Sequence, residues 1–113
     1  MFEDVYYVYI GRLNFILDDN IEHFTVARVA YFISQSQCEL EVPKDDIFKE
    51  GRTFNMFILK KTTIRKMRAH ILSTRSAHPR TLTIRISVKM RQTNLSRTEK
   101  FMCNVKGIKY DDR

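Results

Sequence analysis

Residues 82–89 constrain the fold more than any other part of the chain, because apolar and polar side chains alternate there without a break. Alternation with a period of two is typical of a strand that buries one face. A sheet must therefore form, and other segments must supply its partner strands. The apolar set is Leu82, Ile84, Ile86 and Val88, and the polar set is Thr83, Arg85, Ser87 and Lys89.

Three further segments favour strands. Residues 5–10 are β-branched and aromatic and end at Gly11, residues 38–42 alternate as a half-buried edge strand does, and residues 53–59 are aromatic and aliphatic. Together with residues 82–88 they give the chain four predicted strands.

Two segments favour helices. Asp19 and Glu22 resemble a capping box before an apolar pattern that runs to Ile33, although residues 29–33 could also extend as a strand. The second pattern follows Thr62 or Thr63 as N-cap, with Ile64, Met67, Ile71 and Leu72 at a spacing of i, i+3, i+7, i+8. The predicted order is β-α-β-β-α-β.

The charges divide the chain into two unlike halves. Residues 1–51 hold 4 Lys and Arg against 10 Asp and Glu, and residues 52–113 hold 16 against 3. A basic half suits a polyanion, an acidic partner, or the acidic half of a second copy. A solvated basic face without a partner is the alternative.

The ends and the cysteines indicate a compartment. The chain opens with acidic residues, Glu3 and Asp4, where a secretory signal would be basic. Cys38 and Cys103 form no CxxC pair and are expected to be reduced thiols. We expect an intracellular protein, cytoplasmic or nuclear.

Two short motifs resemble those of the RNA recognition motif family. Residues 8–13, Val-Tyr-Ile-Gly-Arg-Leu, resemble its hexamer, with Arg12 in place of the usual Asn. Residues 52–59 lie at the position of the family's octamer motif. Arg52 and Phe54 match this motif, whereas Thr53, Asn55 and Met56 differ from it. The resemblance implies a ferredoxin-like α+β sandwich, a four-stranded antiparallel sheet with two helices on one face.

The resemblance covers residues 1–90 as one domain, and residues 91–113 form a basic extension that is partly disordered or docked. Within the extension, residues 101–105 are an apolar patch that could be an extra strand, a docked tail or a partner-binding peptide.

The resemblance also assigns the faces of the sheet. It directs Val8, Ile10, Phe57, Leu59, Leu82, Ile84 and Ile86 toward the helices. In the family, aromatic side chains on the open face stack nucleic-acid bases. The expected RNA- or partner-binding residues on that face are Tyr7, Tyr9, Phe54, Met56, Ile58 and Arg85, and the expected basic contacts are Arg52, Arg65, Lys66, Arg68, Lys89 and Arg91.

Two functions follow from these expectations. An open face that carries Met and aliphatic side chains favours a protein-assembly module, homo- or hetero-oligomeric, as in adaptor complexes of small-RNA (piRNA) processing. The alternative is single-stranded RNA binding, in which Tyr9 and Phe54 stack bases and basic residues contact phosphates.

An enzyme is not expected, because His23, His70 and His78 lack metal-ligand spacing and no paired carboxylates or Gly-rich phosphate loop occur. No cofactor, metal, membrane or small-molecule substrate is expected.

Overall fold

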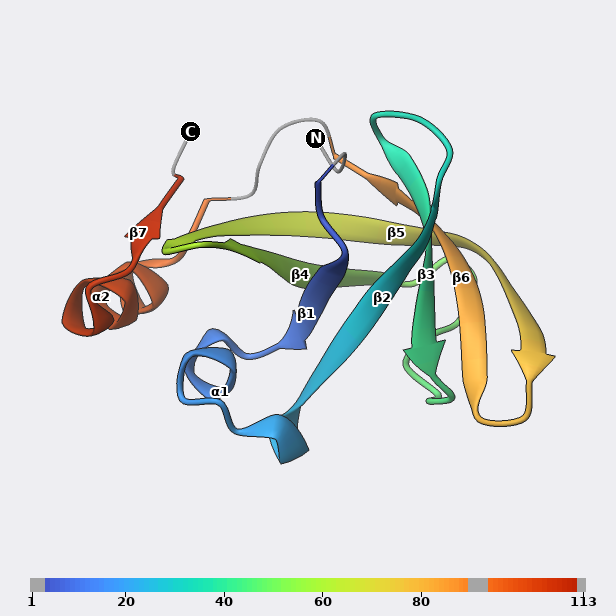
Figure 1. The fold of residues 1–113 in the computed structure, drawn as a ribbon, viewed down its shortest axis with the longest axis horizontal. Helices are drawn as coiled ribbons and strands as arrows, with labels where there is room; N and C mark the ends of the chain where they lie inside the picture. Colours follow the sequence, from blue (N-terminus) through green and yellow to red (C-terminus); the bar gives the residue numbers. More distant parts are fainter. Residues whose placement is uncertain (1–3, 90–93, 112–113) are drawn as a thin grey trace.

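The structure, a computed structural model, describes residues 4–89 and 94–111 (Figure 1). Its elements are β1 (Tyr7–Gly11), α1 (Leu13–Leu17), the 3-10 helix η1 (Ile21–His23), β2 (Phe24–Phe32), β3 (Gln37–Pro43), β4 (Thr53–Lys60), β5 (Thr63–His78), β6 (Thr81–Val88), α2 (Arg97–Lys106) and β7 (Lys109–Tyr110).

Six strands close into an antiparallel barrel. The hydrogen-bonded order is β4-β1-β2-β3-β6-β5, and β5 also pairs with β4, so that the sheet returns to its starting strand. The short strand β7 adds in parallel to the start of β5. Closure removes the exposed sheet edges that an open sheet would have.

The predicted ferredoxin-like sandwich is therefore wrong, and both predicted helices are strands. Residues 21–32 of the first form η1 and then β2, and residues 63–72 of the second belong to the 16-residue strand β5. The predicted strands at residues 5–10, 38–42, 53–59 and 82–88 are confirmed as β1, β3, β4 and β6 within one or two residues, except that the first begins at Tyr7. However, β3 is no edge strand, because it pairs with both β2 and β6.

The prediction of the second helix is wrong because β5 buries residues on both of its faces. Ile64 lies in an outer cluster beneath α2, whereas Met67 and Ile71 lie inside the barrel. This change of face places buried residues three apart on a strand, which imitates a helical spacing.

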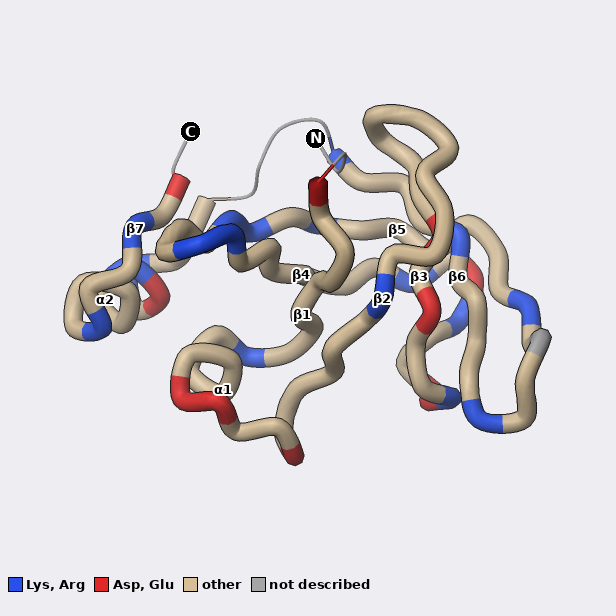
Figure 2. The backbone as a smooth tube through the Cα atoms, viewed as in Figure 1, with Lys and Arg blue, Asp and Glu red and all other residues tan. Residues whose placement is uncertain are grey.

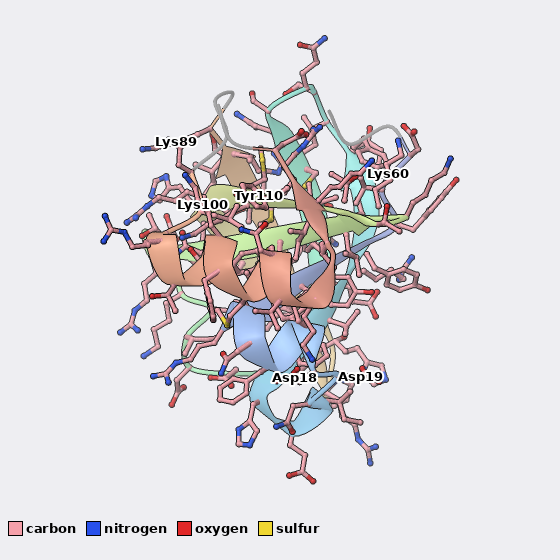
Figure 3. The ribbon with its side chains drawn as sticks, turned by 90° about the vertical axis from the view of Figure 1, so that its left-hand side faces the viewer. Asp18, Asp19, Lys60, Lys89, Lys100 and Tyr110 are labelled. Atoms are coloured by element: carbon pink, nitrogen blue, oxygen red, sulfur yellow. The ribbon has the colours of Figure 1, made fainter. Side chains whose placement is uncertain are left out.

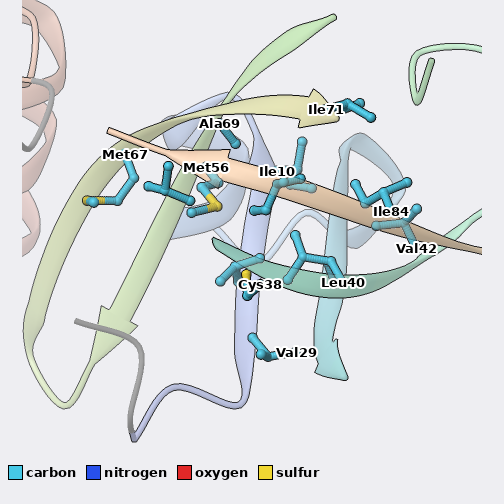
Figure 4. Packing of buried hydrophobic residues seen from close by; sticks show 14 of the residues in the cluster. Ile10, Val29, Cys38, Leu40, Val42, Met56, Met67, Ala69, Ile71 and Ile84 are labelled. Carbon is cyan, nitrogen blue, oxygen red and sulfur yellow. The ribbon is translucent and has the colours of Figure 1, made fainter. Parts of the chain in front are cut away.

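The interior of the barrel is filled by one apolar cluster, to which every one of the six strands contributes (Figure 4). Phe48 and the partly buried Phe54 close one end of it, with ring centroids 6.0 Å apart in an edge-to-face arrangement. The other members within the strands are Val8, Ile10, Ala27, Val29, Cys38, Leu40, Val42, Met56, Ile58, Met67, Ala69, Ile71, Ile84, Ile86 and Val88.

A second cluster lies outside the barrel, between β1, β4 and β5 and the two helices. Leu13 and Ile16 of α1 and Cys103 of α2 pack there against Phe57 and Ile64. The helices therefore cover one part of the outer barrel surface and leave the rest to solvent, as Figure 1 shows.

Candidate interface formed by the two helices

The six residues expected on one open sheet face do not share a face. Met56 and Ile58 are 0% and 4% exposed inside the barrel, and Phe54 packs against the same cluster. Tyr9 lies outside, under the helices, with its ring 6.0 Å from that of Phe24. The prediction of a shared binding face is corrected, because a closed barrel turns one side of each strand inward.

The two remaining members lie on the outer surface. Tyr7 is 54% exposed on β1. Arg85 of β6 donates to Glu39 of β3 at 3.2 Å, and Arg75 donates to the same carboxylate at 3.0 Å. Burial alone would raise the pKa of Glu39, but the hydrogen bonds and charges of the two arginines outweigh burial and lower it.

The residues expected to make basic contacts differ in whether they form ion pairs within the chain. Arg65 forms an ion pair of 2.8 Å with Asp111, and Lys66 forms one of 2.9 Å with Glu99. Arg68 donates to the hydroxyl of Thr53, while Arg52 and Lys89 are exposed. Arg91 lies outside the described residues.

The helices bring together a surface of which the sequence indicated only the apolar patch at residues 101–105, and this patch lies in the helix α2. Phe101 and Val105 stand one turn apart on α2, and each is 67% exposed. They border a shallow groove of about 100 Å³ between the helices. We call this surface the α1–α2 face, and its lining residues are Asn14, Leu17, Asp18, Phe101, Met102, Val105 and Lys106.

Local sequence chemistry explains why α2 forms. The hydroxyl of Ser96 accepts from the backbone N–H of Glu99, and the Glu99 carboxylate accepts from the backbone N–H of Ser96. Gly107 ends the helix in the left-handed conformation, with φ of 68°. The Ser-x-x-Glu spacing and the glycine eight residues later are the signals that could have predicted this helix within the expected basic extension.

The two edges of the α1–α2 face carry opposite charge. Figure 3 views α2 from the front, with Lys100 at one edge and Asp18 and Asp19 beneath α1 at the other. In Figure 2 acidic residues lie at the end of α1, as they do at several other places, while basic residues follow the turn into β5 and the strand itself. Lys106 bridges the end of the groove, with its Nζ 2.5 Å from Oδ1 of Asp18.

Two kinds of feature were not found among the described residues. No group of three or more His, Cys, Asp or Glu within residues 4–89 and 94–111 could hold a metal ion. In the same part of the chain, no helix has the length and apolar character to cross a membrane.

Comparison with known proteins gives no family for this chain. No protein-family model, no curated protein and no solved structure matches it. Its function must therefore be argued from its own residues.

Proposed function

We propose that this chain is a non-catalytic assembly module that pairs with a second copy of itself through the α1–α2 face. The observation that carries the proposal is the exposure of Phe101 and Val105 beside an apolar groove. Large apolar side chains gathered at a groove and rimmed by polar residues are typical of protein interfaces. Aromatic and Met side chains are enriched in the cores of such interfaces, and Phe101 and Met102 supply both kinds.

A second copy fits this face because its exposed apolar residues lie along one line on α2. A two-fold rotation about an axis that lies in the interface, parallel to α2, places Phe101 and Val105 of one copy against the same residues of the other. Symmetric pairing uses the same patch twice and is the commonest form of protein association.

The base-stacking alternative loses the surface on which it depended. Met56 and Ile58 lie inside the barrel, and Tyr9 lies under the helices. The resemblance that led to a small-RNA adaptor complex implied a sandwich fold, whereas the structure is a barrel, so the present proposal does not rest on that resemblance. Self-association depends on neither, because Phe101 and Val105 lie outside the region that carried the resemblance.

Disulfide trapping tests the pairing directly. In the proposed dimer, Val105→Cys places two thiols near each other across the two-fold axis, so mild oxidation at micromolar protein should yield a covalent dimer. Tyr6→Cys is the matched control, because Tyr6 is 69% exposed but lies outside the α1–α2 face. The native thiols Cys38 and Cys103 are buried and free. Equal trapping of both variants, or none of either, would contradict the proposal.

A further inference from the structure

Two cations face each other across neighbouring strands, one on β5 and one directly after β6. Lys89, directly after β6, donates its backbone N–H to the carbonyl of Arg68 on β5 at 3.3 Å. Both side chains are exposed. Like charges that lie directly opposite on adjacent strands destabilise a sheet.

Further basic residues follow along the same strands. His70, two residues after Arg68, is exposed and pairs in register with Thr53 on one side and Ser87 on the other. Arg52 precedes Thr53 and is exposed, and its carbonyl accepts from the N–H of Ile71. We call Arg52, Arg68, His70 and Lys89 the basic sheet patch.

At several other places on the barrel, cations meet carboxylates. Arg28 pairs with Glu41, Arg75 and Arg85 with Glu39, Lys66 with Glu99, and Lys60 with Asp4. Among the ion pairs of residues 4–89 and 94–111, none includes a member of the basic sheet patch. The fold therefore holds clustered positive charge there without an internal counter-charge.

Polar groups between the cations suit phosphate oxygens. Thr53 and Asn55 on β4 and Ser87 on β6 flank Arg68 and His70 in register. Hydroxyl and amide side chains beside Arg and Lys commonly donate to phosphate and sugar oxygens in nucleic-acid complexes.

We infer that the basic sheet patch binds the phosphate backbone of a single-stranded nucleic acid without reading its bases. Charge complementarity selects a polyanion. No exposed large apolar side chain belongs to the patch or to its flanking residues Thr53, Asn55 and Ser87, so this part of the described surface offers no apolar anchor for a lipid surface. A flexible single strand can adjust the spacing of its phosphates to the four side chains, whereas a duplex holds its phosphates at fixed positions.

The test measures fluorescence anisotropy of a labelled 12-nucleotide uridine RNA and its thymidine DNA counterpart across a salt series. The double variant Arg68→Ala/Lys89→Ala removes two patch charges. Lys44→Ala/Arg80→Ala is its matched control, because these exposed cations are also backbone-bonded neighbours but lie at the opposite end of β6. Both variants have the same net charge.

We expect the patch variant to lose at least tenfold in affinity for both strands, with the control within about twofold of the unaltered chain. The slope of log affinity against log salt should fall by about 1.4 in the patch variant, since each single-strand phosphate contact contributes about 0.7. Equal losses in both variants, tighter binding of a 12-base-pair duplex, or no binding by the unaltered chain at 50 mM salt would overturn the inference. Because Phe101 and Val105 are unchanged in both variants, the outcome is independent of the proposed dimer.

Discussion

The Nζ atom of Lys66 on β5 lies 2.9 Å from Oε1 of Glu99 on α2, and each side chain retains only 14% of its exposure. The same carboxylate caps its own helix through the backbone N–H of Ser96. One side chain thus both starts α2 and fixes the helix to the barrel wall, which places Phe101 and Val105 at the surface.

Removing the cation should loosen this attachment. In Lys66→Ala the half-buried carboxylate loses its charged partner, and we expect the free energy of unfolding to fall by about 1–3 kcal/mol. Urea unfolding followed by circular dichroism measures the loss. Arg28→Ala is the control, because its ion pair with Glu41 is more exposed and lies outside the α1–α2 face, so the loss should be smaller. A loss in Lys66→Ala no greater than in the control would show that the pair does not hold α2.

The same carboxylate predicts a dependence on pH. Burial alone would raise the pKa of Glu99, but the hydrogen bonds from Ser96 and the charge of Lys66 outweigh burial and lower it below its ordinary value of 4.5. A lowered pKa in the folded state contributes stability that is present above pH 4.5 and is lost as the pH falls through the folded value. The stability difference between the unaltered chain and Glu99→Gln should therefore be largest at pH 6 and shrink toward pH 3 in thermal melts. A difference that stays constant over this range would contradict the assignment.

Met56 distinguishes the barrel from an open sheet. Its side chain is fully buried in the barrel, so Met56→Ala should reduce the free energy of unfolding by about 2–5 kcal/mol. Tyr7→Ala, on the outer surface, should change it by no more than about 0.5 kcal/mol. Urea unfolding of both variants measures the two losses. A near-neutral Met56→Ala would favour the exposed position that an open sheet gives it.

The thiols should resist alkylation in the folded protein. Burial, with a smaller effect of the Glu39 carboxylate, raises the pKa of Cys38 to about 12, and burial also raises the pKa of Cys103. Since the thiolate is the reactive form, iodoacetamide at pH 8 should leave both cysteines unmodified by mass spectrometry. The urea-unfolded chain should add two groups. Rapid modification of Cys38 in the native protein would contradict its place in the core.

The sequence could predict the strands whose burial alternates. Along β6, Leu82, Ile84, Ile86 and Val88 lie on the inner face, as the alternation indicates. The period of two is visible because the outer face of β6 is polar, so that only one side of the strand carries apolar residues.

The sequence could not predict strands that are buried on both sides. In β4, Met56, Phe57 and Ile58 are consecutive buried residues, because the barrel interior takes the first and third and the helices cover the second. Continuous burial removes the alternation that would have shown which side faces inward. The face assignments of Phe54, Met56 and Ile58 failed for this reason.

The α1–α2 face also could not be predicted from the pattern of the sequence. It depends on two short helices, far apart in sequence, that meet on the outer wall of a barrel. The capping box at Ser96 and Glu99 indicates a helix, but no local signal shows that Phe101 and Val105 remain exposed once that helix has packed.

The solution mass of the Phe101→Asp variant, beside that of the unaltered chain, tests the assembly proposal most directly. Light scattering on a sizing column should give the unaltered chain twice its 13.5 kDa mass, and the variant a single copy with an unchanged circular dichroism spectrum. Burial of a charged side chain in an apolar interface without a partner is strongly unfavourable, so the dimer should be lost. An unaltered chain that stays at 13.5 kDa over a wide concentration range, or a Phe101→Asp variant that remains dimeric, would contradict pairing through the α1–α2 face.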